Sequence, residues 1–137
     1  MTRSELKRLS VLRLKEAKAL IAKKRYSGGY YLSGYSIECA LKACIAKKVR
    51  RNEFPDLKTI QDSYTHNLEK LIGVAGLKTN LSSIIKADSS FAANWATAKD
   101  WSEEARYKFY KQRDAQDLYK AISDPEKGVL QWITNYW

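Results

Sequence analysis

One histidine and two cysteines are the side chains of this sequence whose chemistry best suits neutral pH. His66 is the only histidine, and an imidazole can take up and return a proton in that range. Cys39 and Cys44 are five residues apart, which on a helix separates them by about 140° around the axis and prevents a disulfide. These three side chains are too few for a zinc site. We therefore expect no metal and no cofactor, and we interpret both thiols as small core or boundary residues.

A second set of candidate residues recurs at helical spacing near residue 110. The polar side chains that follow one another at steps of four, three and four are Arg106, Tyr110, Arg113 and Asp117. The pattern predicts one long helix over 102–123, with this polar stripe on one side and Tyr107 on the side facing the core. Lys111 lies beside the stripe. Guanidinium and ammonium groups hold phosphate well, so Arg106, Tyr110, Lys111 and Arg113 are our candidate anion-binding or nucleotide-binding residues.

A third set is a predicted polar network at the edge of the core. Glu38 lies where the apolar face of its predicted helix meets solvent, with Lys42 one turn further on. An acid and an arginine at the core edges of two packed helices commonly pair, so we predict a network of Glu38, His66 and Arg106. In this interpretation His66 bonds to Glu38 or to a backbone carbonyl and fixes a short helix. The alternative is that His66 acts as an acid or base, or joins Arg106 in a ligand pocket.

The charge of the chain is unevenly distributed. The formal net charge is +10, and residues 1–51 hold 14 Lys or Arg but only three acids. This basic first third could attract phosphate, an anionic membrane or an acidic partner protein, or it could be only a solvated helix face. The first 24 residues carry charges every few positions, and no later stretch is apolar enough to span a membrane. We therefore expect a cytoplasmic protein that does not enter membranes.

The length of 137 residues, with only six glycines and two prolines, predicts a single all-α domain over 1–137. We expect a bundle of five or six helices in which two long ones form an antiparallel pair. The first helix should end near residues 26–29, where two glycines follow each other, and a loop should precede a short helix capped by Thr65 and stopped by Gly73. The helices predicted after the first cover residues 30–49, 66–72, 80 to about 95 with a break near 88–90, 102–123 and 124 to the end.

Three blocks of the sequence resemble the HEPN domain family. These blocks are YLSGYSIECALKA (31–43), THNLEKL (65–71) and ARY (105–107), and their order and spacing agree with the family. With the flanking helices, the similarity spans nearly the whole chain. The resemblance implies an all-α bundle, usually a homodimer, in toxin–antitoxin or phage-defence systems, often encoded beside a small nucleotidyltransferase. It also implies either a metal-independent ribonuclease or a non-catalytic nucleotide-binding or partner-binding domain.

The ribonuclease motif of that family is incomplete in this sequence. The motif has an arginine followed after four to six residues by a histidine, and Arg106 matches the arginine. Where the family has the histidine, this chain has Lys111, Gln112 and Arg113. Cleavage by the 2′-hydroxyl of RNA needs a group that exchanges protons near neutral pH, which an ordinary lysine or arginine does not do. The sequence thus favours a non-enzymatic domain that binds nucleotide, RNA or a partner protein.

Two other functions stay open at the level of the sequence. One is a ribonuclease toxin that uses His66, or Lys111 with a lowered pKa, in place of the missing histidine. The other is an adaptor for a nucleotidyltransferase encoded nearby.

Overall fold

The structure is a computed structural model that describes residues 1–49 and 53–137, and every regular element in these ranges is helical. The predicted all-α bundle is confirmed, although the described residues form eight α-helices and one 3-10 helix, η1, rather than five or six helices. In chain order the elements are α1 (Arg3–Ala22), α2 (Tyr26–Lys48), α3 (Leu57–Ser63), α4 (Leu68–Val74), α5 (Lys78–Ala87), α6 (Ser89–Ala98), η1 (Glu103–Tyr107), α7 (Gln112–Ser123) and α8 (Val129–Ile133).

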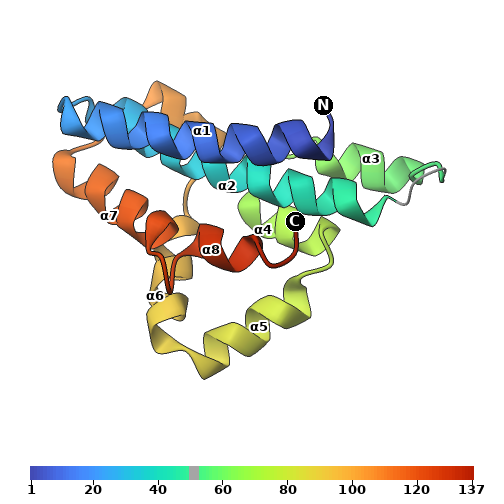
Figure 1. Cartoon of the computed structure of the whole chain (residues 1–137). Helices are drawn as coiled ribbons and strands as arrows, with labels where there is room; N and C mark the ends of the chain where they lie inside the picture. Colours follow the sequence, from blue (N-terminus) through green and yellow to red (C-terminus); the bar gives the residue numbers. More distant parts are fainter. Residues whose placement is uncertain (50–52) are drawn as a thin grey trace.

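The two longest helices, α1 and α2, lie side by side and run in opposite directions (Figure 1). The predicted long antiparallel pair is therefore confirmed. The predicted stop of the first helix at residues 26–29 is wrong, because α1 ends at Ala22 and Lys24 turns the chain with a φ of +60°. Gly29 lies inside α2, where an added Cβ would lie 2.5 Å from Ile21 Cγ1. This glycine thus allows the two helices to approach closely instead of ending one of them.

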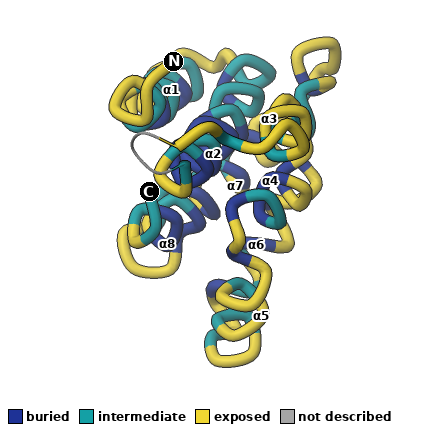
Figure 2. The backbone as a smooth tube through the Cα atoms, turned by 90° about the vertical axis from the view of Figure 1, so that its right-hand side faces the viewer, coloured by how far each residue is buried: buried dark blue, intermediate teal, exposed yellow. Residues whose placement is uncertain are grey.

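α2 forms the centre of the core. Twelve of its 23 residues are buried, and it contacts α1, α4, α7, α8 and η1. Figure 2 shows buried positions concentrated along α2 and exposed positions along the outer helices. Ile37 and Leu41 of α2 belong to one hydrophobic cluster with Leu71 of α4 and Ile122 of α7. Burying an aliphatic side chain of this size stabilises a fold by about 2 kcal/mol, so α2 is the scaffold that holds the other segments in place.

The region between α2 and α5 contains one more helix than predicted. The expected loop includes α3, whose first turn is capped by Asp56 Oδ1, which accepts from the Thr59 N–H at 2.9 Å. α4 starts at Leu68 with Asn67 as its N-cap, not with Thr65, and it continues through Gly73. The chain turns instead after Ala75, at Gly76, with a φ of +74°. The predicted end of the second helix partly concerns residues 50–52, which lie outside the described residues.

The break predicted near 88–90 is present. Asp88 separates α5 from α6, and its Oδ1 accepts from the Phe91 N–H at 3.0 Å, which caps α6. Lys127 Nζ donates to Asp88 Oδ2 at 2.7 Å and joins this corner to the turn before α8. α5 extends away from the rest of the molecule, and none of its residues is fully buried (Figure 2).

The long helix predicted over 102–123 is wrong. The chain forms η1, passes through residues 108–111 without helical structure, with Lys108 and Lys111 in extended conformation, and only then enters α7. Tertiary contacts of Tyr110 override the helical pattern, because its N–H donates to Ser27 Oγ at 2.8 Å and its ring stacks on that of Tyr30. The final helix is also shorter than predicted. Asp124 accepts from the N–H groups of Glu126 and Lys127 in a turn, and α8 begins only at Val129.

None of the helices formed by residues 1–49 and 53–137 combines the length and the apolar character that a membrane crossing requires.

Candidate functional site

The first candidate site is the stretch 106–113, here called the basic–aromatic segment, which connects η1 to α7. Tyr110 anchors it to α2. The rings of Tyr110 and Tyr30 are parallel within 13°, with centroids 3.7 Å apart. Burial, followed by the nearby Tyr110, raises the pKa of Tyr30 to about 12. Tyr110 was predicted as a ligand-binding residue, but the structure uses it to position the segment.

Two aromatic rings next to this anchor point into solvent. Tyr110 packs inward on Tyr30, whereas Phe109, the residue before it, takes no part in the hydrophobic core. The Phe109 side chain is fully exposed and Tyr107 is 74% exposed. The prediction that Tyr107 faces the core is therefore wrong. The Arg106 guanidinium carbon lies 4.9 Å from the centroid of the Tyr107 ring, in cation–π distance.

Four cationic side chains surround these rings: Arg106, Lys108, Lys111 and Arg113. All four are exposed. Arg113 Nε lies 3.7 Å from Asp117 Oδ2, and the Arg113 side chain is 91% exposed. No ion pair engages the other three cations in the part of the chain that the structure describes. The predicted single helical stripe does not exist because residues 108–111 are not helical, yet two of its predicted members, Arg106 and Arg113, lie with Lys111 in one short exposed stretch.

Lys108 and Phe109 were missed by the sequence interpretation. Their signal is nevertheless present in the sequence, because aromatic and basic residues follow one another from Arg106 to Lys111. A helical interpretation of this stretch divides those residues between two faces. Only the structure shows that this stretch is not helical, that Tyr110 packs inward and that the Phe109 ring is fully exposed.

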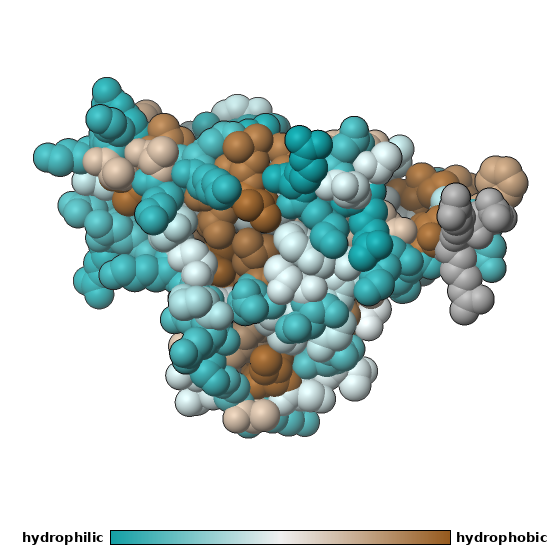
Figure 3. Space-filling model, viewed as in Figure 1, coloured by the Kyte–Doolittle hydropathy of each residue, from teal (hydrophilic) through white to brown (hydrophobic). Residues whose placement is uncertain are grey.

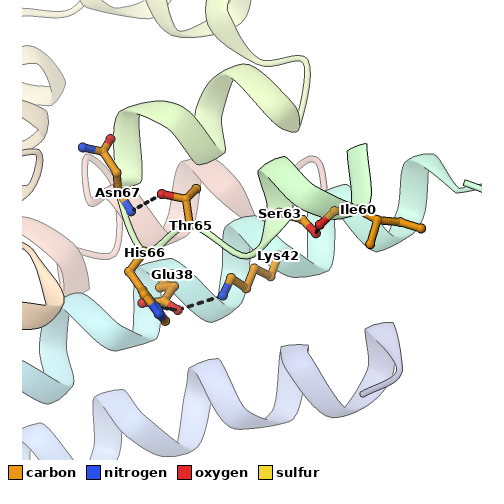
Figure 4. Close-up of polar contacts among 7 residues, drawn as sticks. All are labelled: Glu38, Lys42, Ile60, Ser63, Thr65, His66 and Asn67. Atoms are coloured by element: carbon orange, nitrogen blue, oxygen red, sulfur yellow. Dashed lines mark hydrogen bonds and ion pairs between the residues drawn. The ribbon is translucent and has the colours of Figure 1, made fainter. Parts of the chain in front are cut away.

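The second candidate site is a buried carboxylate with an exposed imidazole on it (Figure 4). Glu38 is 2% exposed, and its Oε1 accepts from Lys42 Nζ at 3.0 Å and lies 2.7 Å from His66 Nδ1. The predicted contact between Glu38 and His66 is thus present. A carboxylate at this distance favours the tautomer with the proton on Nδ1, which leaves Nε2 as an acceptor on a side chain that is 46% exposed.

Arg106 does not join this network, so the predicted three-member set is wrong in that residue. The only interaction of Arg106 among the described residues is with the Tyr107 ring. Lys42, one turn along α2 from Glu38, occupies the cationic position instead. Glu38 Oε2 and Trp101 Nε1 are buried and have no hydrogen-bond partner within the ranges 1–49 and 53–137. Because the carboxylate is bonded on one oxygen only, its position depends on Lys42 and His66.

The backbone before α4 holds His66 in place. Thr65 Oγ1 accepts from the Asn67 N–H at 3.1 Å, and Asn67 Oδ1 accepts from the Lys70 N–H at 2.9 Å. Ser63 Oγ donates to the Ile60 carbonyl at 2.7 Å and closes the end of α3 (Figure 4). These side-chain bonds on both sides fix the connection that carries the imidazole over α2.

The two thiols are unsuited to nucleophilic chemistry. Both are 3% exposed, and burial raises the pKa of Cys39 to about 12 and that of Cys44 to about 11. The described residues also contain no cluster of three His, Cys, Asp or Glu side chains arranged to hold a metal ion.

Comparison of the chain with models of protein families, with curated proteins and with solved structures finds no match.

Proposed function

We propose that the protein binds single-stranded RNA, or a nucleotide, at the basic–aromatic segment. The observation that carries this proposal is the full exposure of Phe109, beside the largely exposed Tyr107, within a row of cations. A folded domain gains no core stability from an aromatic ring in water, whereas such a ring can stack on an unpaired base. The neighbouring ammonium and guanidinium groups would hold the phosphates on either side.

The anchoring of the segment supports the same proposal. The Tyr30–Tyr110 stack and the bond from Tyr110 N–H to Ser27 Oγ hold the extended backbone in place without a ligand. A segment that is already ordered loses less conformational freedom when it binds. Bases inside a duplex are stacked on each other and cannot reach Phe109, so a single strand is the expected substrate class.

The same residues favour binding over cleavage. A guanidinium group is not a proton acceptor in proteins, and a lysine exposed to solvent is a poor one at neutral pH. Four other properties remain predictions from the sequence: membership of the HEPN family, a role in toxin–antitoxin or phage-defence systems, a homodimer and a cytoplasmic location. An adaptor role beside a nucleotidyltransferase also remains a prediction, which the identity of the neighbouring genes would test.

Fluorescence anisotropy with labelled single-stranded RNA, and separately with labelled ATP and GTP, tests the proposal. We expect Phe109→Ala with Tyr107→Ala to weaken RNA binding by about tenfold or more, since each stacked base contributes about 1–3 kcal/mol. The matched control is Phe54→Ala with Tyr64→Ala, which removes two equally exposed rings elsewhere.

A salt series adds an independent measurement. The logarithm of the association constant falls linearly with the logarithm of the salt concentration. For a single strand, each phosphate that the segment no longer neutralises should make this slope less steep by about 0.7. Replacing Arg106, Lys108 and Lys111 with Gln should therefore flatten the dependence. Absence of binding by the folded protein at low salt, or equal binding by the segment variant and the control variant, would refute the proposal.

A second candidate function is RNA cleavage through His66, and the Glu38–His66 contact is the observation that favours it. A buried carboxylate on Nδ1 with a free Nε2 is the arrangement in which an imidazole acts as a general base. The imidazole would take the proton of a 2′-hydroxyl, whose oxygen attacks the adjacent phosphorus and forms a 2′,3′-cyclic phosphate. The bond from phosphorus to the 5′-oxygen of the next nucleotide breaks, and that oxygen takes a proton from water. Incubation of RNA with the pure protein tests this, with His66→Ala, Arg106→Ala and Glu38→Gln as comparisons. Equal cleavage by His66→Ala and the unmodified protein, or no cleavage at all, excludes it.

A further inference from the structure

One exposed apolar surface lies on α3 and is here called the α3 stripe. Phe54, Leu57, Ile60 and Tyr64 follow one another at steps of three, three and four, which places the helical positions on one side. Their exposed fractions are 101%, 68%, 36% and 75%, and α3 has no buried residue. A seven-residue helix is marginal by itself, so an uncovered apolar side indicates that something else packs against it.

A second apolar surface is a groove on α1, here called the α1 groove. Its lining includes Leu9, Val11, Leu12 and Trp137, and it has a volume of about 700 Å³. Val11 and Leu12 are 40% and 48% exposed although they lie in the middle of a 20-residue helix. In Figure 3 apolar side chains gather over the middle of α1 and α2, and again at the end of the molecule that carries α3.

The two surfaces differ in charge. The α1 groove is lined by Lys7, Arg8 and Lys15 against one acid, Glu5, whose carboxylate is already bonded to the N–H of Thr2. The stretch 53–64, which contains the α3 stripe, has three acids and one base, a net charge of −2. Two grooves or two stripes would bring like charges together, whereas a groove against a stripe brings opposite charges together. Charge thus favours contact between the unlike surfaces.

We propose that the α3 stripe of one copy of this chain docks in the α1 groove of a second copy. Leu57 and Tyr64 fill the apolar part of the groove, and Arg8 and Lys15 face the acidic start of the stripe. Such a contact joins two different patches, one from each copy. It does not involve the basic–aromatic segment, so it stands or falls independently of the proposed RNA binding.

Sedimentation velocity over a range of protein concentrations and salt concentrations tests the proposal with two single variants. Leu57→Asp places a charge on the stripe and leaves the groove intact, and Leu12→Asp does the reverse. Both residues are at least 48% exposed, so both variants should fold, which circular dichroism checks. We expect the unmodified protein to associate, and each variant alone to associate at least about tenfold more weakly.

The decisive measurement is the equimolar mixture of the two variants. The intact stripe of one and the intact groove of the other should form a one-to-one complex, which a contact between like surfaces cannot produce. Ser83→Asp, at an exposed position of α5 outside both surfaces, is the control and should associate normally. The proposal is overturned if the unmodified protein is monomeric up to about 1 mM at low salt, where even a weak contact would be seen. It is also overturned if the mixture stays monomeric, or if a monomeric protein binds vesicles containing phosphatidylserine through the groove.

Discussion

Glu38 and the basic–aromatic segment both place charged side chains where a ligand could be expected, but one is buried and the other is exposed. The carboxylate of Glu38 is buried, and both groups bonded to its Oε1 belong to this chain. The cations of the segment lie in solvent, and three of the four have no acidic partner among residues 1–49 and 53–137. The contrast shows that residue type alone does not identify a binding site. What distinguishes the two regions is whether the chain supplies the partners itself.

The two regions are nevertheless supported by the same helix. α2 carries Glu38, and it also carries Ser27 and Tyr30, which hold Tyr110. Trp101, just before η1, packs against Gly34 of the same helix. Changes at the buried contacts of α2 should therefore affect stability, while changes at the exposed rings of the segment, Tyr107 and Phe109, should affect only what it binds. Four variants test this division, in order of decreasing effect on stability.

The largest loss should come from Gly34→Ala. An added Cβ would overlap the indole of Trp101, which is itself 2% exposed and has little room to move. We expect a loss of about 3 kcal/mol in the free energy of unfolding, measured by urea denaturation. The matched control is Gly28→Ala in the same helix, where the nearest atom is Leu20 Cδ1 at 3.2 Å. That control should be neutral or slightly stabilising because alanine favours helix. Equal losses in both variants would contradict the tight packing at Gly34.

A smaller loss should follow from Glu38→Ala. The substitution removes the acceptor shared by His66 and Lys42, but both partners are partly exposed and can bond to water instead. The cost should therefore be about 2 kcal/mol, below that of breaking a fully buried pair. Glu38→Gln keeps the shape and one acceptor oxygen and should lose about half as much. Thermal or urea unfolding measures both. A loss below about 0.5 kcal/mol for Glu38→Ala would mean that the carboxylate does not hold α4 against α2.

Alkaline pH should weaken the Tyr30–Tyr110 contact. Burial and Tyr110 raise the pKa of Tyr30 from 10.0 to about 12, so the unfolded chain loses this proton at a lower pH than the folded protein. The associated stability is complete below pH 10 and is lost as the pH rises toward 12. Tyr30→Phe keeps the stacked ring without the hydroxyl. Its unfolding free energy should fall less between pH 9 and 11 than that of the unmodified protein, by chemical denaturation at each pH. Parallel curves would refute this assignment.

The smallest effect on stability should come from removing the exposed rings. Tyr107→Ala with Phe109→Ala should change the free energy of unfolding by less than about 0.5 kcal/mol, because neither ring packs in the core. Differential scanning calorimetry beside the RNA titration measures both properties on one sample. A loss above about 1 kcal/mol would mean that these rings support the fold, and the contrast between the two regions would disappear.

Much of the fold follows from patterns that involve only neighbours in the sequence. The apolar spacing in residues 30–49 predicts the central helix, and the polar run at residues 88–90 predicts the break between α5 and α6. The stop of α1 could not be predicted, because glycines at 28 and 29 are as consistent with a turn as with close helix contact. Which of these applies depends on Ile21, which lies against Gly29 only in the folded hairpin. Similarly, only the partner ring Tyr30 shows why the helix predicted over 102–123 breaks at Tyr110.

The sites follow the same rule. A hydrogen bond between Glu38 and His66 was predicted, because an acid at the edge of the core and a histidine at the start of a helix both need hydrogen-bond partners. Lys42 was recognised as the neighbour of Glu38, yet the cationic place in the network was predicted for Arg106. Arg106 and Lys111 were recognised as candidate anion-binding residues by type, but the prediction that both lie on one long helix was wrong. The exposure of Phe109 could not be predicted, because the periodicity of the region indicates a helix, whereas residues 108–111 are not helical.

The sharp turn at Lys24 also bears on how the chain folds. It joins two helices of 20 and 23 residues through only three residues, so their mutual contacts connect positions that are close in sequence. Contacts of this kind lower the contact order and form rapidly. We expect the α1–α2 hairpin to assemble early, before the later helices can dock. The surface that α2 then presents to α4, α7 and α8 would serve as the template on which the rest of the chain condenses.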